Sequence, residues 1–359
     1  MTTSDALSIV AEAPTETGPA PEPSVDGFAR GFARLAEAVR RVVRGKDEAV
    51  ELALTCLLAE GHLLIEDVPG VGKTTLARAL AAALGAQWNR IQFTPDLLPS
   101  DVTGVSVYDQ HTGEFTFRPG PVFAGVVLAD EINRASPKTQ SALLEVMEER
   151  RVTVDGVAHP VPRPFVVVAT QNPVDMDGTY PLPEAQLDRF LMRLVLGYPD
   201  LAAEVEVLTG RREARRVEDI EPVMDLGHVL WMIAAADQVH VAPALYTYLA
   251  SVTAATRDLP EVRLGASPRG SLALLRTAQV RAAAAGRAFA TPEDVKALAV
   301  PVLAHRILLT TEAHVQGLTP EAVVRGALAA VPVPHDLDEN SHDQAVVSGK
   351  RYENAGTTP

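Results

Sequence analysis

A glycine-rich stretch of the chain carries the residue types that bind phosphate in proteins. It reads Asp67-Val68-Pro69-Gly70-Val71-Gly72-Lys73-Thr74-Thr75 and stands between an apolar run and a helical segment. Glycines let backbone N–H groups converge on an anion, and the first turn of a helix adds positive partial charge. Lys73 could then reach the outer phosphates of a nucleoside triphosphate, while the Thr74 hydroxyl could bind Mg²⁺. The alternative is a tight strand-to-helix turn with an ordinary surface lysine.

One position of this loop departs from the usual phosphate-loop pattern, G-x-x-x-x-G-K-[ST]. Asp67 stands where the first glycine is expected. Aspartate is among the few other residues that tolerate unusual backbone angles, so the loop geometry could survive. Its carboxylate would lie near an anion site, however, and could weaken nucleotide binding.

Two further polar groups follow apolar runs later in the chain. Asp130 and Glu131 end the run 126–129, and Thr170-Gln171-Asn172-Pro173 ends the run 165–169. Beside a phosphate loop, Asp130 would help to hold Mg²⁺, and Glu131 would act as the general base for a water molecule. A polar amide at the second strand end could contact the γ-phosphate or orient that water. Taken separately, an acidic pair is commonly just solvated, and Asn-Pro favours a turn.

The elements that would position these groups alternate along the chain. Near-continuous Val, Ile and Leu runs are typical of strands that are buried on both faces of a parallel sheet. The five runs are 63–65, 89–93, 126–129, 165–169 and 191–196. Helical spacing of apolar residues precedes them at 28–44, and a second helix is expected at 46–59. We therefore predict an α/β fold, an αβα sandwich around a parallel sheet.

The pattern changes after about residue 200, which divides the chain. Residues 222–335 contain several helical stretches and almost no strand, so we predict a smaller, all-helical domain there. The predicted division is a disordered acidic tail at 1–26, a nucleotide-binding core at 27–200, a linker at 201–221, the helical domain at 222–335 and a flexible tail at 336–359.

The composition limits the class of function. A hydrophobic content of 47% and a charged content of 22% fit a soluble globular protein. A net charge of −14 argues against nucleic acid as a partner, because phosphate backbones are bound by basic surfaces. Neither a signal peptide nor an apolar run of membrane-spanning length is evident, so we expect a cytoplasmic protein without membrane insertion.

Five segments in this order resemble AAA+ ATPases, and specifically the MoxR family. The segments are 67–74, Leu128-Ala129-Asp130-Glu131-Ile132-Asn133-Arg134-Ala135, Ala169-Thr170-Gln171-Asn172-Pro173, Leu182-Pro183-Glu184-Ala185-Gln186-Leu187-Asp188-Arg189-Phe190 and Gly265-Ala266-Ser267-Pro268-Arg269. The resemblance covers 27–335, nearly the whole chain. It implies a P-loop NTPase core with a helical lid, with ATP and Mg²⁺ as cofactors.

The resemblance also assigns roles to residues that the local pattern leaves open. Asn172 looks like the sensor 1 residue, and Arg189 looks like the arginine finger, which reaches into the site of a neighbouring subunit. Arg269 looks like the sensor 2 residue at the start of a lid helix, acting in its own subunit or in the neighbour. Without the other motifs, Arg189 would be interpreted as a surface arginine paired with Asp188 or Glu184.

An arginine finger supplied by a neighbour implies a homo-oligomeric ring, and we expect a hexamer. The resemblance implies chaperone-like remodelling of a client protein, often with a partner that carries a von Willebrand factor A domain. The alternatives are a metal-chelatase motor subunit, which shares these motifs, and a nucleotide-gated binding module that does not hydrolyse ATP. Two β-hairpins, at 105–117 and 152–157, are also predicted and would contact substrate, line the ring's pore or thicken the contact between subunits.

Overall fold

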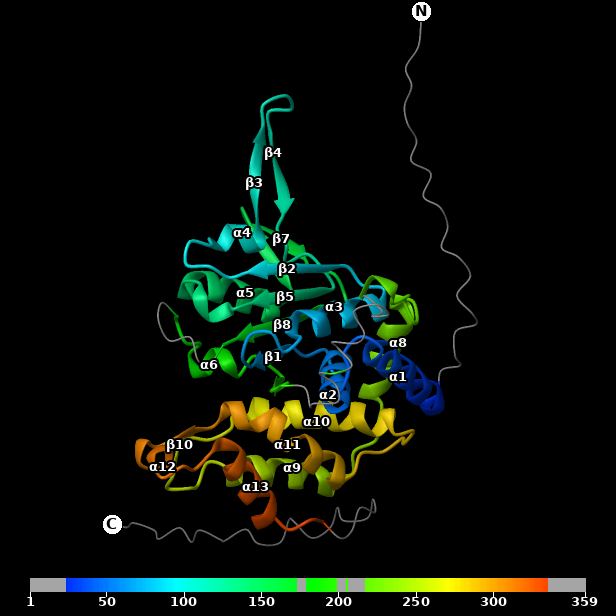
Figure 1. The fold of residues 1–359 in the computed structure, drawn as a ribbon, viewed down its shortest axis with the longest axis vertical. Coiled ribbons are helices and arrows are strands. Elements are labelled where there is room, and N and C mark those ends of the chain that lie inside the picture. Colours follow the sequence, from blue (N-terminus) through cyan, green and yellow to red (C-terminus); the bar gives the residue numbers. More distant parts are fainter. Residues whose placement is uncertain (1–23, 173–178, 199–204, 206–216, 335–359) are drawn as a thin grey trace, which may run out of the picture.

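The computed structural model describes residues 24–172, 179–198, 205 and 217–334 of the chain. These residues form a layered α/β core with a helical lid packed beneath it, and one β-hairpin projects away from the core on the side opposite the lid (Figure 1). Both predicted tails fall largely outside the described residues. The predicted tail at 1–26 is slightly too long, because helix α1 begins at Val25 and the Ser24 hydroxyl caps it by accepting from Gly27 N at 3.0 Å.

A five-stranded parallel sheet forms the centre of the core. Its strand order is β2-β5-β8-β1-β9, and every neighbouring pair is parallel. The strands are β1 (Leu63–Glu66), β2 (Trp88–Gln92), β5 (Val126–Asp130), β8 (Val166–Gln171) and β9 (Met192–Leu194). All five predicted apolar runs are strands of this sheet, and β5 is buried along its whole length. The predicted fold class is therefore confirmed.

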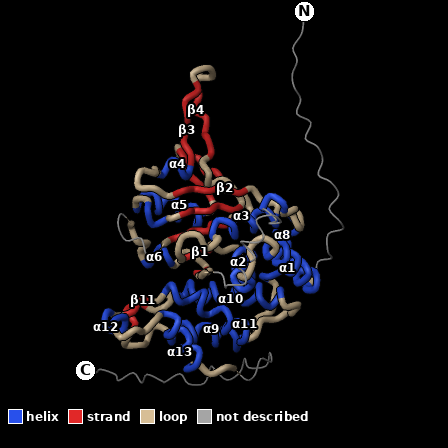
Figure 2. The backbone as a smooth tube through the Cα atoms, viewed as in Figure 1, coloured by secondary structure: helices blue, strands red, loops and turns tan. Residues whose placement is uncertain are grey.

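Helices cover both faces of this sheet (Figures 1 and 2). They are α1 (Val25–Arg40), α2 (Asp47–Leu58), α3 (Lys73–Leu84), α4 (Pro99–Thr103), α5 (Pro137–Glu149) and α6 (Glu184–Leu187), with a short 3-10 helix at Ile132–Arg134. The apolar spacing that predicts α1 is the spacing of its buried residues, Phe28, Phe32, Leu35 and Val39. Helix α3 begins directly at Lys73, so the phosphate loop connects β1 to the first turn of α3.

Two β-hairpins extend from the core, as the sequence predicts. Strands β3 (Gly104–Asp109) and β4 (Glu114–Pro119) form the projecting hairpin, and β6 (Arg151–Val154) pairs with β7 (Val157–Pro160). The ring of Phe117 stacks on the ring of His159, with centroids 4.0 Å apart and planes 20° apart. This contact joins the two hairpins near their bases.

Gly104 is required where α4 turns into the projecting hairpin. Its φ is +98°, and a Cβ placed there would lie 2.3 Å from the carbonyl oxygen of Arg118 and 2.6 Å from the backbone nitrogen of Gly120. We expect Gly104→Ala to lower the free energy of unfolding by about 2–4 kcal/mol, because the clash is with backbone and the φ disfavours a side chain. A urea titration followed by circular dichroism measures this change.

Gly326→Ala is the matched control for that substitution. Gly326 lies within helix α13, and a Cβ there meets no atom within 4 Å. The control is expected to be neutral or to stabilise by up to about 1 kcal/mol, since alanine is the better helix former. Equal effects of the two substitutions would contradict the steric argument.

The lid consists of helices with one small ribbon of strands. The helices are α8 (Leu226–Asp237), α9 (Pro243–Ala255), α10 (Pro268–Ala284), α11 (Pro292–Leu303), α12 (Thr311–Val315) and α13 (Pro320–Ala330), with a 3-10 helix at Ala304–Arg306. Strands β10 (Val262–Leu264) and β11 (Leu308–Leu309) pair antiparallel. The expectation of an all-helical lid is thus corrected at this ribbon, whose strands are too short to show a period in the sequence.

The hydrophobic core crosses the predicted boundary between core and lid. Helices α1 and α2 both pack against α10, while α2 also packs against β1 and β9 and α1 packs against α3. A single buried cluster contains residues of all these elements. The end of the predicted linker packs against α3, because Glu218 of a 3-10 helix at Val217–Asp219 pairs with Arg78. Just after the linker, Val223 N donates to Ala83 O of α3 at 2.9 Å. Residues 201–204 and 206–216 of that linker lie outside the described residues. Within the described part of the chain, no helix has the length and apolarity needed to cross a bilayer.

Candidate functional site

The phosphate loop has the geometry of an anion cradle. Gly70 and Gly72 have φ angles of +86° and +94°, and a Cβ at either position would meet no atom within 4 Å. The space in front of the loop is therefore open. The first turn of α3 has no side-chain cap, which leaves its N–H groups available to a ligand. Thr74 and Thr75 lie in this same turn, half-buried.

Lys73 lies among three carboxylates at the base of the loop. Its Nζ donates to the backbone oxygen of Asp67 at 2.6 Å. Partial burial lowers the pKa of Lys73, and the negative charges of Asp130, Asp67 and Glu131 oppose that shift. The structure thus brings Lys73 and Asp67 of the loop into one site with the two strand-end acids, which lie more than 50 residues later in the sequence.

Asp67 differs from its predicted role in two ways. The left-handed residues of the loop are Gly70 and Gly72, and Asp67 is not among the residues with positive φ. Its carboxylate does not stand free beside the loop, because it accepts from Val68 N at 2.8 Å and from Gly197 N at 2.5 Å. Asp67 therefore ties the phosphate loop to the segment that follows β9, which satisfies its charge with backbone donors.

Asp130 is buried at the carboxyl end of β5 and bonded through both oxygens. Its Oδ1 accepts from the Thr170 hydroxyl at 2.6 Å, and its Oδ2 accepts from Arg90 at 2.6 and 3.1 Å. Each carboxylate oxygen has two acceptor sites, so Asp130 can still bind a cation. Arg90 was not predicted as a site residue.

Glu131 is held in a strained and fixed position. Its φ is +57°, a conformation that non-glycine residues adopt rarely, and its N–H donates to the Thr170 hydroxyl at 2.9 Å. Its Oε2 accepts from Gln92 Nε2 at 2.9 Å and lies 3.2 Å from Arg134 Nε. These contacts fix the carboxylate at the edge of the site.

The amide segment lies at the carboxyl end of β8, between the ends of β5 and β1. Asn172 is buried there, directly after the strand. Gln171 Nε2 donates to Glu66 Oε1 at 2.6 Å, and Asp67 N donates to Gln171 O at 3.2 Å, so this strand end is bonded to the phosphate loop. Pro173, the last residue of the predicted segment, lies outside the described residues.

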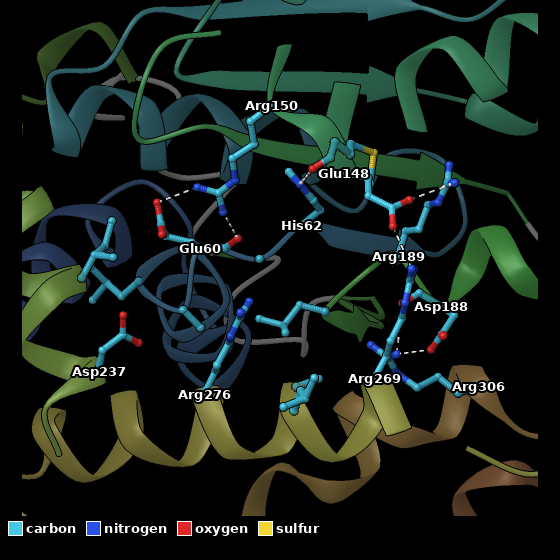
Figure 3. A pocket seen from close by; sticks show the side chains of 18 residues that line it. Glu60, His62, Glu148, Arg150, Asp188, Arg189, Asp237, Arg269, Arg276 and Arg306 are labelled. Atoms are coloured by element: carbon cyan, nitrogen blue, oxygen red, sulfur yellow. Dashed lines mark hydrogen bonds and ion pairs between the residues drawn. The ribbon is translucent and has the colours of Figure 1, made fainter. Parts of the chain in front are cut away.

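Arg189 and Arg269 lie together in a different place, a cleft of about 540 Å³ between the core and the lid (Figure 3). The cleft is rich in arginine. Its arginines are Arg150, Arg189, Arg269, Arg276 and Arg306. Gly61 and His62, which also line it, directly precede β1, whereas the phosphate loop directly follows β1. The cleft and the loop therefore lie at opposite ends of this strand, whose four residues span on the order of 13 Å at 3.3 Å per residue.

Glu148, at the carboxyl end of α5, binds both of these arginines. Its Oε2 lies 3.0 Å from Arg189 Nη2, and its Oε1 accepts from Arg269 Nη2 at 2.7 Å (Figure 3). Arg189 thus pairs with Glu148 and not with Asp188 or Glu184, the partners of the alternative interpretation. Asp188 instead pairs with Arg306, and Glu184 pairs with Arg263 at 3.1 Å. The two arginines, one from the core and one from the lid, thus converge on a single carboxylate.

His62, in the wall of this cleft, makes stability depend on pH. It is buried, with Val167 N donating to Nδ1 at 3.0 Å and Nε2 lying 3.1 Å from Met147 O, and burial lowers its pKa to about 4. Because the unfolded chain takes up this proton near pH 6.5 and the folded chain does not, stability is full above that pH and falls towards pH 4, by roughly 1.4 kcal/mol per pH unit.

We expect His62→Gln to be less stable than the wild type at pH 7.5 but to lose less stability on going to pH 5.5. Urea titrations at the two pH values measure the change in the free energy of unfolding with pH for the wild type and for the variant. His111→Gln, at an exposed position of the projecting hairpin, should keep the wild-type slope. His305, buried with its pKa lowered in the same direction, leaves part of the slope in place in every variant.

Two parts of the chain match known families. Residues 62–192 match the family described as ATPase family associated with various cellular activities (AAA). Residues 254–327 match the AAA lid domain. The first match contains the phosphate loop, both strand ends and Arg189, and the second contains Arg269.

Several relatives match over most of both chains. The uncharacterized protein YeaC of Bacillus subtilis is 50% identical, over 84% of this chain and 94% of its own. Chaperone MoxR1 of Mycobacterium tuberculosis is 42% identical (88% and 86%), and protein MoxR of Paracoccus denitrificans is 34% identical (83% and 94%). The solved structure of a proposed ATPase from Cytophaga hutchinsonii is 36% identical and superposes with a TM-score of 0.81, covering 86% of this chain and 97% of that one.

Proposed function

This chain belongs to the MoxR family of AAA+ ATPases, and from that premise we propose that it hydrolyses Mg²⁺-ATP at sites shared between neighbouring subunits. The energy of hydrolysis would remodel or mature a protein partner. One observation carries the proposal. The candidate groups fall into two sets at opposite ends of β1, with Lys73 at one end and Arg189 and Arg269 at the other.

This separation supports sites that two subunits share. A guanidinium that stabilises charge on the transferred phosphoryl group must contact that group. Arg189 and Arg269 lie at the opposite end of β1 from Lys73 in their own subunit, so they would serve the ATP of the next subunit. A head-to-tail interface of this kind forms a ring when the rotation between neighbouring subunits closes, and we propose a hexameric ring. For Arg269, this favours action in the neighbour's site over action in its own.

The residues at the carboxyl edge of the sheet fit Mg²⁺-ATP. The open, glycine-lined loop would bind the phosphates through backbone N–H groups, with Lys73 on the outer phosphates. The Thr74 hydroxyl and the Asp130 carboxylate are hard oxygen ligands of the kind that Mg²⁺ prefers. When bound, the metal would neutralise charge that develops on the phosphate oxygens.

Glu131 would remove the proton from the attacking water. A carboxylate held by Gln92 and Arg134 has a defined position, which suits a general base. The water oxygen would attack the γ-phosphorus in line with the departing ADP oxygen, and its proton would pass to Glu131. Asn172 would orient the water or contact the γ-phosphate, since it ends the strand next to β5.

The alternative, a nucleotide-gated module that does not hydrolyse ATP, depends on the Asp67 carboxylate repelling the phosphates, and the structure makes such repulsion weaker. The Asp67 carboxylate is bonded to two backbone N–H groups, so it presents less uncompensated charge to ATP. The client and a von Willebrand factor A-domain partner remain proposals that follow from the family. The exposed aromatic pair on the projecting hairpin, Tyr108 and Phe115 with ring centroids 5.3 Å apart, is a candidate contact for such a client.

Phosphate release from ATP and Mg²⁺, measured across protein concentration, tests the proposal. We expect the turnover per subunit to rise with protein concentration, because a lone subunit lacks the arginines of its neighbour. Lys73→Ala should abolish turnover together with ATP binding. Turnover that is independent of concentration would contradict the shared site, and tight ATP binding without turnover in assembled protein would favour the gated module.

A further inference from the structure

Asp188, the residue before Arg189, joins the core to the lid through both of its carboxylate oxygens. Oδ1 pairs with Arg306 of the 3-10 helix at Ala304–Arg306, and Oδ2 accepts from the Ser267 hydroxyl at 2.8 Å. Asp188 ends the short helix α6 of the core, whereas both partners belong to the lid. The residue directly before Arg189 is therefore attached to the lid.

Arg306 makes this attachment rigid. Its exposed fraction is only 7%, and its guanidinium also donates to Phe190 O at 2.6 Å and to Asp188 O at 3.0 Å. Arginine keeps its charge when buried, so the Asp188 carboxylate supplies the negative partner that burial requires. Three bonds from one side chain thus hold 188–190, the segment that contains Arg189.

Ser267 connects the same point to Arg269. It is the N-cap residue of α10, and its hydroxyl oxygen accepts from Arg269 N at 3.1 Å while its proton goes to Asp188. The backbones of Arg189 and Arg269 are thus separated by one aspartate–serine contact. Their side chains then converge on Glu148, at 3.0 and 2.7 Å.

We propose that Asp188 is a positioning residue that holds Arg189 beside Arg269 through Arg306 and Ser267, so that both guanidiniums are directed at one phosphate of the neighbouring subunit. The inference rests on the proposed function, because the phosphate in question is the neighbour's ATP. Arginine side chains are long, and their reach is set by where their backbones are fixed. A displacement of about 1 Å at a reacting group can lower a rate roughly 10²-fold.

Two substitutions weaken this link without changing either arginine. Asp188→Asn removes the charge that faces Arg306 and keeps the size of the side chain, and Ser267→Ala removes the bond to Asp188 Oδ2. We expect kcat to fall roughly 10²-fold in Asp188→Asn and about tenfold in Ser267→Ala. The affinity for ATP, measured by a fluorescent ATP analogue, should stay at the wild-type value, since the ATP of each subunit binds at its own Lys73.

Loss of the α10 cap is a separate consequence of Ser267→Ala, and Thr310→Ala controls for it. Thr310 caps α12 by accepting from Ala313 N at 3.3 Å, and among the described residues no hydrogen bond joins its side chain to the core. The control should lose a similar cap energy and keep the wild-type kcat. Equal kcat values in Ser267→Ala and Thr310→Ala would overturn the inference.

Mixing two kinds of variant subunit distinguishes an effect on the placement of the arginines from a general defect of the Asp188→Asn subunit. Asp188→Asn subunits keep Glu131 but present displaced arginines, and Glu131→Gln subunits present sound arginines but lack the base. A 1:1 mixture should release phosphate faster than the sum of its parts, because about a quarter of the head-to-tail interfaces combine a sound base with sound arginines.

The outcomes of the mixing experiment point to different conclusions. Arg189→Ala subunits, mixed in the same way with Glu131→Gln subunits, give the reference. If phosphate release recovers in that mixture but not in the mixture with Asp188→Asn, the positioning role is overturned, because the defect then lies inside the Asp188→Asn subunit itself. Failure of both mixtures, with all proteins folded and assembled, would overturn the shared site and this inference with it.

Discussion

Arg189→Ala is expected to lower the turnover of ATP about 10³-fold, because an arginine that contacts the transferred phosphoryl group contributes on that scale. The affinity of the chain for ATP should not change, since Arg189 lies at the end of β1 away from Lys73 in the same subunit. Phosphate release at saturating ATP, together with titration of a fluorescent ATP analogue, measures both quantities. Arg189→Lys should recover little, because an ammonium cannot form the two parallel bonds of a guanidinium.

Arg263→Ala is the matched control for this substitution. Arg263 is an exposed arginine on the same side of the lid–core junction, paired with Glu184 at 3.1 Å. An exposed pair of this kind contributes little to stability, so the control should keep the wild-type turnover. A wild-type rate in assembled Arg189→Ala would remove Arg189 from the proposed site.

Glu131→Gln is expected to lower kcat by about 10² to 10⁴, the range that a general base contributes. Glutamine keeps an oxygen that can accept from Gln92 Nε2, so the strained backbone and the shape of the site should persist. What is lost is the basicity that removes the proton of water. ATP should therefore bind with wild-type affinity and stay unhydrolysed, which single-turnover measurements can separate from slow product release.

Glu149→Gln is a useful comparison for this variant. Glu149 lies at the end of α5, exposed and paired with Arg151 at 3.1 Å. It undergoes the same chemical change, and although it follows Glu148 in the sequence, it is not among the residues that line the cleft. A drop in rate for Glu149→Gln as large as that for Glu131→Gln would show that the effect is one of net charge rather than of the base.

The centre of the sheet could be predicted from the sequence because strands such as β5 and β8 are buried on both faces. That burial requires near-continuous apolar runs, and each run is visible without any knowledge of its neighbours. The order of the strands is set by long-range packing, which no local pattern contains. For this reason Arg90 and Gln92 were not recognised as site residues: β2 lies beside β5, so these two side chains reach Asp130 and Glu131. The only local signal was that these two polar residues alternate with the buried Ile91 along β2.

The site residues also divide into those that local motifs reveal and those that only long-range contacts reveal. Lys73, Thr74, Asp130, Glu131 and Asn172 stand in motifs whose spacing is local, and their places at the carboxyl edge follow from parallel strands. Glu148 and Arg306 make contacts across more than 100 residues, Glu148 with Arg269 and Arg306 with Asp188, and no motif marks them. The meaning of Asp67 was likewise hidden, because its partner Gly197 lies 130 residues away.

The placement of Lys73 and Arg189 at opposite ends of one strand determines how many complete sites an assembly of subunits contains. If each site needs one end from each of two subunits, an open row of n subunits holds n − 1 complete sites, and its two terminal subunits each leave one half unused. Closing the row creates the last site without adding a subunit. The rate of ATP hydrolysis would then be proportional to the number of interfaces rather than to the number of chains. A subunit that is defective at one end only would inactivate one of its two interfaces and leave the other active.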